Sequence, residues 1–502
     1  MWLQRIPLFA FCLAGAGLAM ALPAAHGLYA GNERAARTFA YCGLVSLVMA
    51  GMLALALANR TPRITARAQL LTLVASYALL PLVAAAPVVL LRPEMDLERA
   101  YFEMLSCLTT TGATLMDGAS VSQTMHLWRA TVAWCGGFLI VLSAAAIMAP
   151  LNLGGFEVRA TLRGSRPEEG LAQAGSVAAS MRLLRMVRLL GPSYLILTIV
   201  LAFLLAVAGE APLLSMIHAM SVMSTSGISI DSEGFGSGAG RLGEMIALPF
   251  LVIAATQRGL RIRFTRADLA WARRDPELRL MLVMVMSVAA ILFLRHWLGA
   301  LTVSTEPDLL GGLRALWGAI FTGLSFLTTT GFTSVDWDLA RAWSGLPSSG
   351  MILLGLAMMG GGVASAAGGV KLLRCYALFR QGVRELGRLT YPSSIGGAGE
   401  AERRLRQGGA YISWVFLMLF VGTLSLVMLA LTLTGVGFQD ALAFSIAALT
   451  TTGQVPQMAD TGGPGYSEIS AVARGILCVG MVLGRLETLA VIALFNPSWW
   501  RR

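Results

Sequence analysis

Four short segments of this sequence share one pattern and decide its fold. They are SCLTTTGATLMD (Ser106–Asp117), SVMSTSGISID (Ser221–Asp231), SFLTTTGFTSVD (Ser325–Asp336) and AALTTTGQVPQ (Ala447–Gln457). The segments align without gaps around a glycine, and successive glycines lie 115, 104 and 122 residues apart. One T-T-T-G alone is typical of an ordinary polar turn. Four copies indicate an internal repeat, which is sought before any other feature because it governs the whole fold.

Each copy ends a short apolar segment that lies between longer ones. A membrane-spanning helix needs about 20 apolar residues, and the short segments favour re-entrant helices, which must be surrounded by protein or a water-filled cavity. The short segments are 98–112, 212–227, 314–331 and 438–453. The longer ones are 6–30, 36–59, 68–91, 126–149, 187–209, 242–257, 279–302, 347–383 (interrupted by glycines), 410–435 and 468–495. The sequence therefore predicts an all-α polytopic membrane protein with ten spans and four pore half-helices.

Composition supports this class and excludes others. Of 502 residues, 56% are hydrophobic and only 13% charged, against about 25% charged in soluble domains. The six cysteines form no C-x-x-C pair, and the four histidines have no metal-ligand spacing. The glycine-rich stretch Gly362–Lys371 is followed by Leu372, where a phosphate-binding P-loop needs Ser or Thr. Neither a metal enzyme nor a nucleotide-binding chain is indicated.

The positive charges predict the orientation. With the N-terminus inside, the cytoplasmic connections and the C-terminal Arg501 and Arg502 hold 26 of the 38 lysines and arginines. This agrees with the positive-inside rule and places both termini in the cytoplasm. The net charge of +11 therefore mainly reflects the orientation in the membrane and not a nucleic-acid-binding surface. Binding of anionic lipid or of an acidic partner stays open as a further contribution. The outer connections carry acidic residues, namely Asp117, Asp231, Glu233, Asp336, Asp338 and Asp460.

The repeat suits a cation path. Four units can surround one axis with pseudo-fourfold symmetry, and rings of backbone carbonyls can replace the hydration shell of an ion. The half-helices would direct their negative C-terminal ends toward the pore centre. We expect two extra N-terminal helices in 1–62 and pore repeats in 63–165, 166–272, 273–402 and 403–502. The candidate ion-binding residues are Thr110, Thr111, Gly112, Thr225, Ser226, Gly227, Thr329, Thr330, Gly331, Thr451, Thr452 and Gly453.

This arrangement resembles the TrkH branch of the Trk/Ktr/HKT superfamily of potassium transporters. The likeness covers nearly the whole chain and includes the L-W-R and W-C-G-G-F-L-I-V motifs (Leu127–Val141), G-G-G-V-A-S-A-A-G-G-V-K (Gly360–Lys371) and G-R-L-E (Gly484–Glu487). The resemblance implies K⁺ uptake across a bacterial inner membrane, selected at the four glycines. Because Ser at the first glycine position goes with sodium permeation in relatives, Gly112 favours potassium.

The resemblance also implies partners. It implies a homodimer with one pore in each protomer, and a cytoplasmic TrkA-like regulatory ring. The nucleotide, NAD or ATP/ADP, is expected on that partner, and no cofactor is expected in this chain beyond the transported K⁺.

In the family, the glycine-rich stretch of the third repeat is an intramembrane loop that obstructs the path beneath the filter. The alternative is a closely packed small-residue helix contact. Here the centre of the stretch, Ala364–Ala366, is less polar than is usual in the family. The gating candidates in this stretch are Gly360, Gly361, Gly362, Ser365, Gly368, Gly369 and Lys371, the last of which could instead sit at the inner interface.

Arg485 is a second gating candidate, because a charge inside a span costs about 2.5–3.5 kcal/mol on insertion scales and usually faces the protein interior or water. We expect Arg485 to face the pore as an electrostatic barrier. An ion pair with a neighbouring acid, or snorkelling to the interface, is the alternative.

Three alternative functions differ in the residues that they would require. Transport of Na⁺, or K⁺ transport coupled to Na⁺ or H⁺, would keep the same fold. A polytopic membrane enzyme would need a cluster of acids, histidines or a nucleophile at one depth, and the sequence has none. A non-transporting assembly subunit would not need four intact glycine segments.

Overall fold

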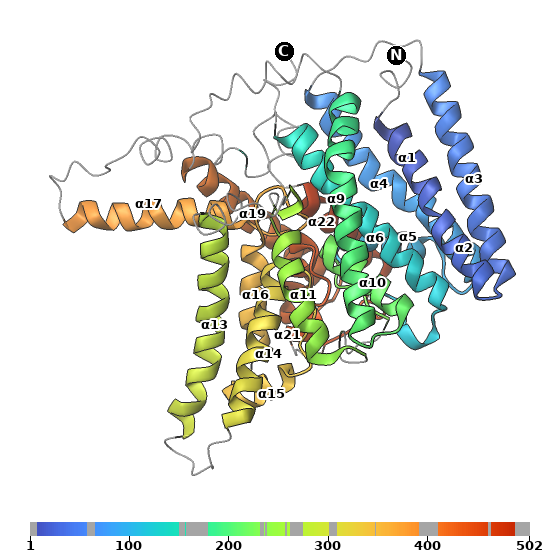
Figure 1. Ribbon diagram of the computed structural model, residues 1–502. Coiled ribbons are helices and arrows are strands. Elements are labelled where there is room, and N and C mark those ends of the chain that lie inside the picture. Colours follow the sequence, from blue (N-terminus) through green and yellow to red (C-terminus); the bar gives the residue numbers. More distant parts are fainter. Residues whose placement is uncertain are drawn as a thin grey trace.

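The computed structural model describes residues 8–57, 66–149, 156, 179–230, 235, 238–256, 259–261, 275–300, 309–346, 348–390, 410–459 and 463–486. Every regular element in these ranges is a helix. Eight of the helices are long and apolar enough to cross a membrane. The predicted class, an all-α polytopic membrane protein, is therefore confirmed (Figure 1).

Three N-terminal helices pack beside the first repeat. They are α1 (Leu8–Ala19), α2 (Ala21–Tyr29) and α3 (Glu33–Ala56), and they contact α4 and α6 of that repeat. The first two are almost continuous and count as one span, Leu8–Tyr29. The division between them lies near Pro23, whose missing N–H removes one bond of the helical ladder.

Each of the four repeats contains an outer helix, a short helix and an inner helix. In every repeat the short helix packs against both of the others. The helices are α4 (Ala66–Leu91), α5 (Leu97–Leu108) and α6 (Gln123–Ser143); α9 (Ala179–Val207), α10 (Pro212–Ser224) and α11 (Gly240–Ala254); α13 (Pro276–Ala300), α14 (Leu309–Leu327) and α16 (Gly350–Met359); and α19 (Ala410–Thr432), α20 (Phe438–Thr450) and α22 (Ala471–Leu486).

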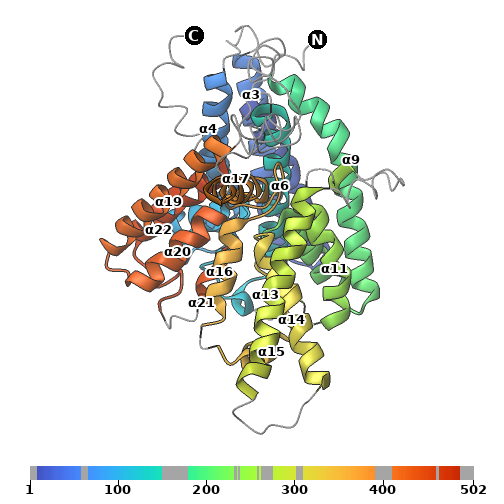
Figure 2. The same cartoon turned by 90° about the vertical axis from the view of Figure 1, so that its left-hand side faces the viewer.

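The repeats contact one another in a closed cycle. The inner helix of each repeat packs on the short helix of the next: α6 on α10, α11 on α14, and α16 on α20. The last inner helix, α22, returns to α5 of the first repeat. In Figure 2 the fourth repeat (orange to red) and the second repeat (green) lie on opposite sides of the molecule. The four short helices are thereby surrounded by protein, as re-entrant helices require.

Seven of the ten predicted spans correspond to long apolar helices of the structure. Of the other three, 242–257 contains the 15-residue helix α11, and 468–495 contains α22, which is described only as far as Leu486. The eighth long apolar helix is α14, which begins at Leu309 and so is longer than the segment 314–331 predicted for it. Its C-terminal end nevertheless stops just before the T-T-T-G, like the other short helices.

The third exception, 347–383, does not form one span. Helix α16 ends at Met359, residues 360–371 are not helical, and α17 (Leu372–Thr390) then runs roughly perpendicular to α13 and α16 (Figures 1 and 2). Helix α17 carries several arginines and is not among the helices apolar enough to cross. Its fully buried Arg374 lies 3.7 Å from the centre of the Phe416 ring, which joins α17 to α19.

Candidate ion-binding site

All four short helices end in the same backbone conformation. The second residue before each glycine is a threonine with φ between 55° and 57°, in the left-handed region. The next residue donates its N–H to the carbonyl six residues before the glycine, at 2.8 to 3.0 Å. These 6→1 bonds are those of a Schellman cap, whose left-handed residue is usually glycine. The left-handed residues are Thr110, Thr225, Thr329 and Thr451.

The three hydroxyl residues before each glycine have different partners. The hydroxyls of the first and third are 2.9 to 3.2 Å apart in every copy. The middle hydroxyl is left over: those of Thr110, Thr225 and Thr451 are buried with no hydrogen-bond partner among the described residues. The fourth, that of Thr329, accepts a hydrogen bond of 2.8 Å from the N–H of Gly368. A buried hydroxyl without a partner is costly, so these three need an explanation that protein contacts do not supply.

The four glycines meet in one ring, which we call the glycine ring. A Cβ added to Gly112 would overlap the carbonyl oxygen of Ser226, and one on Gly227 would overlap that of Thr330. On Gly331 it would come within 2.8 Å of Gln454, and on Gly453 it would reach the backbone of Thr111 and Ala113. Each glycine thus touches the next repeat, and the fourth touches the first. No side chain fits at these four positions.

The fourth member of the ring departs from the other three. Gly112, Gly227 and Gly331 have positive φ, but Gly453 does not. The N–H of Gly453 donates to the carbonyl of Thr111 at 2.6 Å, and its carbonyl accepts from the hydroxyl of Tyr466 at 3.0 Å. The chain then enters the short helix α21 (Val455–Ala459).

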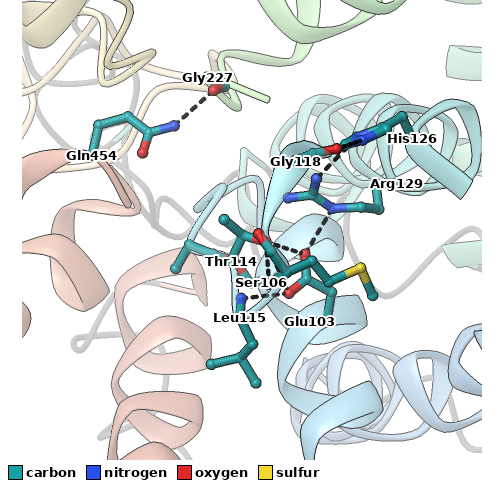
Figure 3. A network of polar contacts seen from close by, with 11 residues as sticks. Glu103, Ser106, Thr114, Leu115, Gly118, His126, Arg129, Gly227 and Gln454 are labelled. Carbon is teal, nitrogen blue, oxygen red and sulfur yellow. Dashed lines mark hydrogen bonds and ion pairs between the residues drawn. The ribbon is translucent and has the colours of Figure 1, made fainter. Parts of the chain in front are cut away.

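Buried acids hold the segments that follow the first three glycines. Glu103 of α5 accepts from the Leu115 N–H at 2.9 Å and from the Thr114 hydroxyl at 3.0 Å, and it pairs with Arg129 of α6 at 2.7 Å (Figure 3). Removing one partner of such a buried ion pair strongly destabilises the folded protein, because the other charge is left buried and unpaired.

The second and third repeats use different acids for the same purpose. Glu210 pairs with His218 at 2.7 Å, and the other ring nitrogen of His218 lies 2.8 Å from the Ser229 hydroxyl. Glu244 of α11 accepts from the Val335 N–H at 2.6 Å and from the Ser334 hydroxyl at 2.8 Å. Sequence reasoning missed all three acids, because they stand at three different positions relative to the glycine and share no motif. Their one common signal is an acid in or next to an apolar segment.

Residues 360–371, here called the glycine-rich loop, lie directly against the ring. Gly368 donates to Thr329 and is so close to the Thr450 carbonyl that a Cβ would overlap it. At its other end, the Gly362 N–H donates to the Ala255 carbonyl, at the end of α11, at 3.0 Å. The loop therefore touches the second, third and fourth repeats. Because these residues are not helical, the alternative of a small-residue helix contact is wrong.

The two basic gating candidates both bind this loop. Arg485 is 3% exposed, and one of its guanidinium nitrogens donates to the Ala366 carbonyl. Among the described residues, its other two nitrogens form no hydrogen bond of good geometry and no ion pair, although the Tyr77 hydroxyl lies near the guanidinium. Lys371 is also buried and donates to the Ala367 carbonyl. In the part of the chain that the structure describes, Arg485 thus forms no ion pair, and both basic side chains are buried within the protein.

The expected acidic mouth is only partly present in the described ranges. Asp117 and Asp338 are exposed. Asp336 is instead buried and forms a two-bond pair with Arg241, at 2.5 and 2.8 Å, so its charge is compensated. Asp231, Glu233 and Asp460 lie outside the described residues, as do Glu487 and most of the arginine-rich connections, including 157–178, 262–274 and 391–409.

The fold and the ring together define a multi-pass helical membrane protein built from four units, each with one Thr/Gly segment at a common centre. The chain belongs to the TrkH family of cation transport proteins, whose family model matches residues 36–501.

Comparison with individual proteins agrees with the family. The Trk system potassium uptake protein TrkH of Salmonella typhimurium is 29% identical over 94% of this chain and 93% of its own length. TrkH of Halomonas elongata is 29% identical over 80% of this chain and 79% of its own. The crystal structure of the potassium transporter TrkH from Vibrio parahaemolyticus matches all of both chains with a TM-score of 0.82 at 24% identity, a likeness in fold.

Proposed function

We propose that this protein takes up K⁺ through the glycine ring, which acts as a selectivity filter with pseudo-fourfold symmetry. The observation that carries the proposal is the set of buried threonine hydroxyls without partners at equivalent positions of three repeats. An ion that has shed water needs oxygen ligands, and these hydroxyls need a partner. The ligands we assign are Thr110, Thr111, Gly112, Thr225, Ser226, Gly227, Thr329, Thr330, Gly331, Thr451, Thr452 and Gly453.

The glycine-rich loop closes the path in this conformation, in our proposal. Its support is the contact of Gly368 with Thr329 and Thr450, which lie at the ends of two short helices. Arg485 holds the loop through Ala366 and adds a buried positive charge that repels a cation. The gating residues are Gly360, Gly361, Gly362, Ser365, Gly368, Gly369, Lys371 and Arg485.

Cellular context is proposed from the charge pattern and the family. The protein lies in a bacterial inner membrane with both termini in the cytoplasm, where the membrane potential drives K⁺ inward with about 2.3 kcal/mol per charge per 100 mV. It forms a homodimer with a pore in each protomer. A TrkA-like ring that binds NAD or ATP/ADP regulates the loop from the cytoplasm. The chain itself is not an enzyme and needs no cofactor.

The decisive experiment is Rb⁺ or K⁺ uptake into liposomes with an imposed inside-negative potential. We expect uptake that saturates with K⁺, follows the potential and resists Na⁺ in excess. Equal competition by Na⁺ would instead support a sodium pathway. Uptake that needs a Na⁺ or H⁺ gradient at zero potential would support coupled transport.

A further inference from the structure

The residue directly after the glycine differs between the repeats. In the first three it is Ala113, Ile228 and Phe332, whose side chains are buried in the apolar core. In the fourth it is Gln454, which is only partly buried. Its amide nitrogen donates a hydrogen bond of 2.7 Å to the carbonyl oxygen of Gly227 (Figure 3).

The local backbone explains why Gln454 faces the glycine ring. Gly453 lacks the positive φ of the other three glycines, and both of its backbone groups are bound, to Thr111 and Tyr466. The chain turns into α21 at Val455 instead of continuing as an extended segment. The side chain that follows the glycine is therefore directed differently from its three counterparts.

The side chain reaches across three repeats. It begins in the fourth repeat, and its Cγ would be 2.8 Å from a Cβ on Gly331 of the third. Its amide ends at Gly227 of the second, 3.3 Å from where a Cβ would stand. It thus fills space that only glycine leaves open, and in the cyclic order of contacts the second and fourth repeats are opposite one another.

We propose that Gln454 is a tethered competitor for the cation site at the Gly227 carbonyl. This inference rests on the proposed function of the ring. The amide N–H is a hydrogen-bond donor with partial positive charge, and it occupies the oxygen that a dehydrating cation would use. A K⁺ ion at this point has to displace the amide first. Gln454 therefore lowers the apparent K⁺ affinity of the ring, and no side chain does so from the same position of the other repeats.

Cation binding in the full-length protein tests this without requiring an open path. Ligand that binds the folded state raises its stability by mass action, so the melting temperature is followed while KCl replaces choline chloride at constant ionic strength. Q454M keeps the length of the side chain and removes the donor. Q457M is the matched control, because Gln457 is exposed on α21, which begins directly after Gln454.

We expect the half-saturating K⁺ concentration to fall about twofold to tenfold in Q454M, the factor that corresponds to one typical neutral hydrogen bond. Q457M should match the wild type. Q454N, whose amide is one methylene too short to reach Gly227, should behave as Q454M does, which guards against a folding defect in one variant.

Two results would overturn the inference while leaving the proposed function intact. An unchanged half-saturation in Q454M and Q454N would show that the amide does not compete. A higher one would show that Gln454 is itself a ligand or a brace for the site. A wild-type protein stabilised no better by K⁺ than by Na⁺ or choline would instead remove the proposed function, and this inference with it.

Discussion

Four threonines hold a backbone conformation that β-branched residues rarely adopt, at a cost of order 1–3 kcal/mol each. Glycine would remove that strain, yet Thr110, Thr225, Thr329 and Thr451 all keep a hydroxyl there. The 6→1 hydrogen bonds and the paired hydroxyls on either side hold the strained residue in place. In the proposed function the retained hydroxyl is a cation ligand, which gives a reason for threonine over glycine.

The glycines make the sharpest residue-scale prediction. Gly112→Ser adds a side chain that would overlap the Ser226 carbonyl at φ +75°, so the ring must widen there. A wider ring fits K⁺ less well, and we expect the K⁺/Na⁺ permeability ratio to fall at least about tenfold, equivalent to about 1.4 kcal/mol. Gly331→Ser should act in the same direction.

The control is Gly422→Ser on α19, where nothing lies within 4 Å of the added atom. It should leave the permeability ratio unchanged. If Gly112→Ser also leaves the ratio unchanged in liposomes, the glycine ring is not the selective element.

At the scale of elements, the glycine-rich loop is held by contacts that can be removed singly. Arg485→Ala deletes the bond to Ala366 and the buried charge. We expect a several-fold rise in Rb⁺ uptake into liposomes without any regulatory partner. Equal or lower uptake in well-folded protein would count against Arg485 as a barrier.

Two further variants distinguish release of the glycine-rich loop from a general loss of structure. Arg474→Ala, on the same helix, removes an arginine paired with Glu98 and should not raise uptake. Gly368→Ala adds a Cβ that overlaps the Thr450 carbonyl and should push the loop from the ring, so it should raise uptake as Arg485→Ala does.

The helices show which parts of the fold could be predicted from the sequence and which could not. Apolar length predicted the long helices, and the repeated T-T-T-G predicted the segments that meet at the ring, because both are local signals. The length of α14 and the turn of α17 away from α16 were not predicted. Neither follows from hydropathy alone, since packing decides where a helix starts and in which direction an amphipathic helix lies.

The same limit applies to the site. Three hydroxyl residues in a row look equivalent in sequence, and only the structure shows that the middle hydroxyl has no protein partner in three of the four copies. Asp336 looked like a mouth acid but pairs with Arg241, 95 residues away. Gln454 and Glu244 act across repeats, on Gly227 and on Val335 respectively, and no spacing rule connects such distant positions.

Across the molecule, the cycle of repeats closes where α22 of the last repeat packs on α5 of the first. The guanidinium of Arg474 pairs with Glu98 through two bonds of 2.9 Å, joining residues 376 positions apart. Arg474 is 6% exposed, and hydrogen bonds to charged groups contribute about 1.5–3 kcal/mol. We expect Arg474→Gln to lower the melting temperature by several degrees.

A double-mutant cycle with Glu98→Gln isolates the pair. If the ion pair holds α22 against α5, the second substitution adds little to the loss of stability caused by the first. Additive losses of melting temperature would show that the two side chains stabilise the protein independently. Other contacts between α22 and α5 would then join the first and last repeats.

The hydrogen bond from Gly368 to Thr329 makes the loop a reporter of what occupies the ring. In the proposed mechanism the same hydroxyl serves the closed loop and the ion, so the two binding equilibria share one free energy of coupling. Such coupling is reciprocal: a loop position that weakens cation binding is itself disfavoured, by the same factor, when cation is bound. Potassium outside the cell would then act as an effector of its own entry, with no separate sensor.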